Sequence, residues 1–139
     1  MWYPHRKAQL TELKALCESF AAAGVQSIAD GADTSDRANA TRLELGLEKV
    51  ELGYEMLIET ARDLGTFISF GINDCEMLLF CEPANFMILN ENRIHAAWVA
   101  SNAFAHTRMQ GAYASAFSDP LVRKKCRASH IAVTAIAVR

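Results

Sequence analysis

The sequence predicts an all-α protein, a single domain of four to five helices built around one long central helix at about residues 36–64. Apolar residues in the middle of the chain repeat at alternating spacings of three and four, as on one face of a packed helix. The 139 residues contain only three prolines and seven glycines, which leaves little room for linkers. With 51% hydrophobic and 22% charged residues, residues 1–139 suit one globular domain.

The first predicted helix covers residues 6–23. Its apolar stripe consists of Leu10, Leu13, Cys17 and Phe20. Gly24 stands where a C-terminal helix cap is expected. Residues 30–36 are then dense in turn-forming and helix-capping side chains. We therefore expect the long second helix to begin near Ser35 and to end near Gly65.

The long predicted helix carries three sets of side chains. Its apolar seam consists of Ala40, Leu43, Leu47, Val50, Tyr54, Leu57, Ala61 and Leu64. A second apolar patch, nearly opposite, consists of Leu45, Leu52 and Met56, and an acidic ridge beside the seam consists of Glu44, Glu48, Glu51 and Glu55. A helix that is apolar on two faces either lies in the middle of its domain or uses one face to contact another chain. We therefore expect the patch and the ridge to form a protein interface, which closes a homodimer or docks a partner. The alternatives are ordinary core packing for the patch, and a solvated face or an internal partner for the ridge.

The remainder of the chain gives less definite patterns. Residues 66–72 suit a short strand or an irregular connector. Asn73 and Glu76 resemble a capping box that would begin a short helix, and Pro83 can open another one. Helices are then expected up to residue 117 and from Pro120 onward, although the β-branched residues at 131–138 also suit a strand.

Charge and motifs exclude several classes of function. The net charge of −2 gives no overall attraction to nucleic acids or to anionic membranes. Because no stretch resembles a membrane span or a secretory signal, we expect a cytoplasmic protein with reduced cysteines. The spacing of the four cysteines fits neither zinc nor redox motifs, so we expect no metal and no cofactor. Phosphate-binding loops, nucleophile elbows and zinc-protease motifs do not occur in the sequence.

A basic patch near the C-terminus consists of Arg123, Lys124, Lys125 and Arg127. It could contact phosphates, as in an accessory subunit that associates with nucleic acid. Arg123 and His130 are separated by six residues, a spacing that resembles the Arg…His pair of helical HEPN-type nucleases. That resemblance covers residues 123–130 and implies a ribonuclease that uses these two side chains. Lys124 departs from the family pattern, which usually has a small polar residue directly after the arginine.

These observations favour a non-enzymatic protein–protein interaction module, because no catalytic constellation accompanies the helical pattern. We expect a small inhibitor, an immunity or antidote protein, or an accessory protein of a bacterial or viral system that binds and modulates a protein partner. A homodimer is expected, and a membrane partner is not. The helical ribonuclease and the nucleic-acid accessory subunit are the alternative hypotheses.

Overall fold

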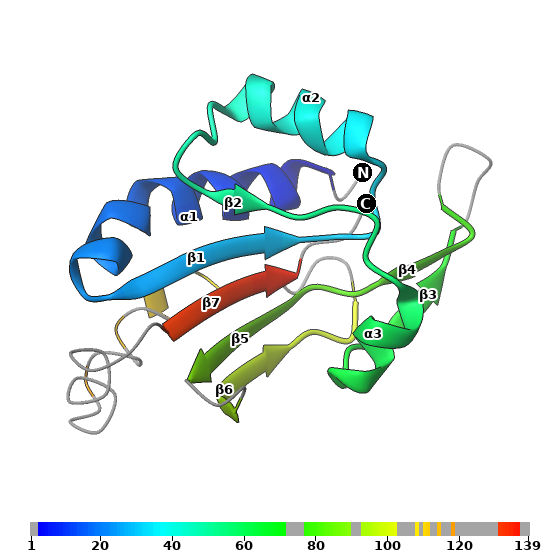
Figure 1. Ribbon diagram of the computed structural model, residues 1–139. Coiled ribbons are helices and arrows are strands. Elements are labelled where there is room, and N and C mark those ends of the chain that lie inside the picture. The colour runs from blue at the N-terminus through cyan, green and yellow to red at the C-terminus, as the bar shows by residue number, and fades with distance from the viewer. Residues whose placement is uncertain are drawn as a thin grey trace.

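The computed structural model describes residues 3–71, 77–89, 93–102 and 131–136, together with Arg108, Gln110, Gly111, Ala114 and Ser118 (Figure 1). It is a mixed α/β fold, so the prediction of an all-α helical bundle is wrong. In chain order the elements are α1 (Tyr3–Ala22), β1 (Val25–Asp30), α2 (Ser35–Leu45), β2 (Glu51–Leu52), α3 (Ile58–Asp63), β3 (Ile68–Phe70), β4 (Leu79–Cys81), β5 (Ala84–Leu89), β6 (Arg93–Val99) and β7 (Ile131–Ile136).

Seven strands form two sheets within the described ranges. The larger sheet has the order β2-β1-β7-β5-β6, in which β1 is parallel to β2 and to β7, and β5 is antiparallel to β7 and to β6. The smaller sheet is the antiparallel hairpin of β3 and β4. Ile136 pairs with both Asp30 and Ala84, so the carboxyl ends of β1 and β7 lie beside the start of β5.

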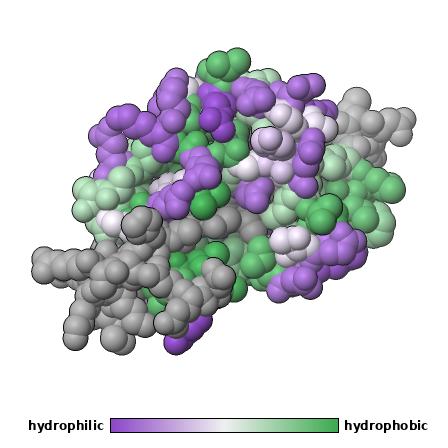
Figure 2. Space-filling view, viewed as in Figure 1, coloured by the Kyte–Doolittle hydropathy of each residue, from purple (hydrophilic) through white to green (hydrophobic). Residues whose placement is uncertain are grey.

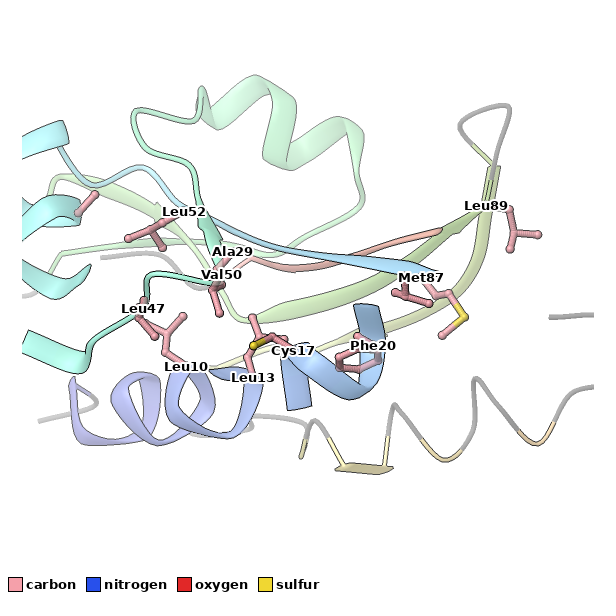
Figure 3. Packing of buried hydrophobic residues seen from close by; sticks show 12 residues of the cluster. Leu10, Leu13, Cys17, Phe20, Ala29, Leu47, Val50, Leu52, Met87 and Leu89 are labelled. Atoms are coloured by element: carbon pink, nitrogen blue, oxygen red, sulfur yellow. The ribbon is translucent and has the colours of Figure 1, made fainter. Parts of the chain in front are cut away.

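One face of the larger sheet is covered by α1, and α2 packs beside it (Figure 1). The cluster of buried residues that these helices form with the sheet consists of Leu10, Leu13, Cys17, Phe20, Val25, Ala29, Ala38, Leu47, Val50, Leu52, Met87 and Leu89 (Figure 3). The amide of Gln9 donates a buried hydrogen bond of 3.1 Å to the Oδ1 atom of Asn85, which joins α1 to β5. The predicted stripe of the first helix is thus confirmed as core.

The opposite face packs against α3 and the β3–β4 hairpin. A second cluster of buried residues consists of Ala32, Ala61, Phe80, Cys81, Ala84 and Phe86. Strand β5 contributes to both clusters, with Met87 and Leu89 in the first and Phe86 in the second. This division follows the alternation of side chains along a strand that is buried on both faces.

The long helix predicted at residues 36–64 does not form. Helix α2 begins near Ser35, as expected, but ends at Gly46, which adopts a left-handed backbone (φ 60°) and donates its N–H to the carbonyl of Arg42. The chain then places Leu47 and Val50 in the core and forms β2 before α3 begins at Ile58. The three/four spacing was therefore not a buried seam, and Leu43 of that seam is 83% exposed.

Other expected helices are strands. Residues 68–70 form β3, which is the short strand that was expected near residues 66–72. The short helix expected around residues 77–79 and the helix expected from Pro83 are replaced by β4 and β5, and β6 occupies residues that were expected to be helical. Residues Ile131–Ile136 form β7, so the strand given as the alternative to a helix at 131–138 is the structure observed. The expected capping box of Asn73 and Glu76 and the expected helix start at Pro120 lie outside the described residues.

Candidate protein-binding surface

The two strands of the β3–β4 hairpin come from uncharged segments of the chain, whereas residues 72–76 between them include Asp74 and Glu76. Residues 64–71 and 77–81 include no Asp, Glu, Lys or Arg. The hairpin pairs Ile68 with Cys81 and Phe70 with Leu79. Its ladder continues at both ends. The N–H of Glu82 donates to the carbonyl of Phe67 at 2.7 Å, and the N–H of Gly71 donates to the carbonyl of Leu78 at 3.1 Å.

The two strands of the hairpin differ in burial, because β4 is mostly buried whereas β3 is half-buried at Ile68 and Ser69 and exposed at Phe70. Phe80 and Cys81 of β4 lie in the second cluster, at 5% and 1% exposure. Phe67 and Phe70, beside and within β3, are 54% and 70% exposed, and Leu78 is 78% exposed. We call Phe67, Phe70 and Leu78 the hairpin surface. Figure 2 shows hydrophobic side chains over the β3–β4 hairpin on the right of the molecule, with hydrophilic side chains next to them.

Buried polar contacts fix the base of the hairpin. Glu82 is buried and accepts a hydrogen bond from the hydroxyl of Ser69 in β3. The hydroxyl of Thr66 donates to the carbonyl of Ala61 in α3 at 2.8 Å. Burial, and to a lesser extent the carboxylates of Asp30 and Glu82, raise the pKa of the Cys81 thiol to about 12. A thiol with that pKa is protonated at neutral pH, so Cys81 is suited to packing and not to nucleophilic chemistry.

A second polar cluster lies where β1 ends and α2 begins. The Nη1 atom of Arg6 in α1 is 2.6 Å from the Oδ2 atom of Asp33, and both side chains are buried. Arg37, in the first turn of α2, has its Nη1 atom 3.8 Å from the Oδ1 atom of the same carboxylate. Asp33 thereby ties the start of α1 to the loop before α2, while among the described residues the buried Nε atom of Arg6 and Oδ1 atom of Asp33 have no hydrogen-bond partner.

Asp30 lines the same small cavity as Arg6 and Asp33 of this cluster. Its Oδ1 atom accepts a hydrogen bond of 2.7 Å from the N–H of Gly31, and burial raises the pKa of its carboxyl. A Cβ atom on Gly53 would lie 2.5 Å from that oxygen, so glycine is needed for this close approach. The cavity between Arg6, Asp30, Asp33 and Gly53 has a volume of about 10 Å³, enough for about one water molecule.

Outside this polar cluster, the described residues do not form a recognisable catalytic or metal-binding site. They contain no group of three or more His, Cys, Asp or Glu side chains that could hold a metal ion. A groove of about 550 Å³ lies between α1 and the loop after α2, lined by Lys14, Lys49, Glu18 and Glu48 among others. Its size is that of small-molecule sites, but its charges are of both signs and select no class of ligand.

The residues predicted as an interface are not brought together on one helix. Leu52 is buried and Leu45 half-buried at the first cluster, whereas Met56 packs against the second. Glu44 pairs with Lys7, Glu51 accepts a hydrogen bond from Gln26, and Glu48 and Glu55 lie in loops. The acidic ridge therefore does not exist as a helical row. Whether any of these side chains contacts a partner stays a prediction.

The basic patch at Arg123, Lys124, Lys125 and Arg127 lies outside the described residues, as does His130. The nuclease resemblance implied a helical enzyme, and Ile131, the residue after His130, begins β7.

The hairpin surface was missed as a site, although its strand was expected. The available signal was the lack of charge over residues 64–71, together with Phe67 directly before the short strand and Phe70 at its end. Sequence alone could not tell which of these apolar side chains the fold would bury.

Comparison of the chain with protein-family models, with curated proteins and with solved structures finds no match. Within the described ranges, no helix combines the length and the apolar character that crossing a bilayer requires.

Proposed function

We propose that this protein acts by binding another protein, and that the hairpin surface is where contact is made. The observation that carries this proposal is the exposure of Phe67, Phe70 and Leu78 on a hairpin whose two strands carry no charged residue. Large apolar side chains that gather on one exposed element are typical of interaction sites, whereas single exposed apolar residues are ordinary. Aromatic side chains are also enriched at the cores of protein interfaces.

The size of the surface supports a specific but modest contact. From their exposed fractions, the three side chains present about 400 Å² of apolar area, taking roughly 200 Å² for each fully exposed side chain. Phe67 and Leu78 lie on one face of the ladder and Phe70 on the other. A partner on the first of these faces would remove about 260 Å² from water, which would contribute about 7 kcal/mol at 25 cal/mol per Å² before the costs of association, which are of similar size. The balance favours a reversible complex in which the two phenyl rings act as anchors.

We further propose the class of function that the sequence favours, a small inhibitor, immunity or accessory protein in the cytoplasm. Cys17 and Cys81 are buried free thiols, which agrees with a reducing compartment. An accessory role requires binding without chemistry of its own, and the buried Arg6–Asp33 pair joins α1 to the loop before α2.

A site-specific photo-cross-linker tests the proposal. A photoreactive phenylalanine analogue at position 70 should capture a protein at the hairpin surface in cells that express the chain. The matched control carries the same group at position 43, because Leu43 is a similarly exposed apolar residue on α2. The captured protein is then purified and its binding to the wild type and to Phe67→Ser/Phe70→Ser is measured by calorimetry.

The expected result is a cross-link at position 70 and not at position 43, with binding reduced at least about 100-fold in the double variant, since two anchor residues are removed. Equal binding of the purified protein by the wild type and the double variant would contradict the proposal. So would the lack of any cross-linked product at position 70.

A further inference from the structure

We draw no further inference here: the strongest candidate, the cavity of about 10 Å³ lined by Arg6, Asp30, Asp33 and Gly53 at the carboxyl end of β1, has room for about one water molecule, and the charged groups that the described residues bring to it, an arginine already paired with an aspartate and a second carboxyl, favour neither an anion nor a cation.

Discussion

The two faces of the larger sheet differ in how their outer surfaces are made. On the face that carries α1 and α2, large apolar side chains such as Phe20 and Leu13 are fully buried. Charged pairs lie at the surface above them, Lys7 with Glu44 and Lys49 with Glu18. On the other face, the hairpin buries Phe80 and Cys81 but leaves Phe67, Phe70 and Leu78 in solvent.

Under the proposed function, the two faces have separate roles. Apolar burial under a charged surface stabilises a fold without promoting association. An apolar surface without charge adds little to the stability of the single chain, because water still contacts it. Substitutions on the α1 face should therefore change the free energy of unfolding, and substitutions on the hairpin surface should change association.

The largest expected effect comes from Phe20→Ala, which empties the centre of the α1 face. Phe20 is 0% exposed, so its loss should lower the free energy of unfolding by about 3–5 kcal/mol through lost burial and a cavity. Urea denaturation, monitored by circular dichroism, measures this loss in the free energy of unfolding. A loss below about 1 kcal/mol would mean that the two faces do not differ as described.

A slightly smaller loss is expected from Arg6→Met, which leaves Asp33 buried without its ion pair. The free energy of unfolding should fall by about 3 kcal/mol, since an uncompensated buried charge is costly. Arg37→Met is the matched control, because the Arg37 side chain is 58% exposed and its nitrogen is farther from Asp33. Equal losses in the two variants would contradict a special role for the buried pair.

A still smaller effect concerns the pH dependence contributed by Asp30. Burial raises the pKa of this carboxyl above its ordinary value of 3.8, so the folded state holds the proton more tightly than the unfolded state. The contribution to stability is thus fully present below that value and is lost as pH rises through the folded pKa. In Asp30→Asn this decline should be missing, so urea denaturation at several pH values should favour the variant increasingly as pH rises above 3.8. A difference in the free energy of unfolding between the wild type and Asp30→Asn that stays constant with pH would contradict this prediction.

The smallest change in stability is expected at the hairpin surface. Phe70→Ser should change the free energy of unfolding of the monomer by no more than about 0.5 kcal/mol, since the ring is mostly solvated. Measurement at a concentration where the chain is monomeric removes any contribution from association. A loss comparable to that of Phe20→Ala would show that Phe70 belongs to the core.

Local patterns in the sequence predicted the elements that depend on local contacts. The stripe of Leu10, Leu13, Cys17 and Phe20 gave α1, because an amphipathic helix uses neighbours three and four residues away. Turn and cap residues placed the start of α2 near Ser35, where Thr34 caps the helix. The short strand β3 was also expected, but the exposure of Phe70 at its end was not.

The sequence by itself determined that this chain is globular, that its first helix is amphipathic and that residues 64–71 are uncharged. Only the tertiary structure decided what residues 46–57 become. Leu47 and Val50 have the spacing of a helix, yet they reach the core from a turn, after Gly46 has ended α2 and before β2 pairs with β1. Strand pairing joins residues that are distant in sequence, such as Ile28 with Glu51 and Asp30 with Ile136, so no local period can reveal it.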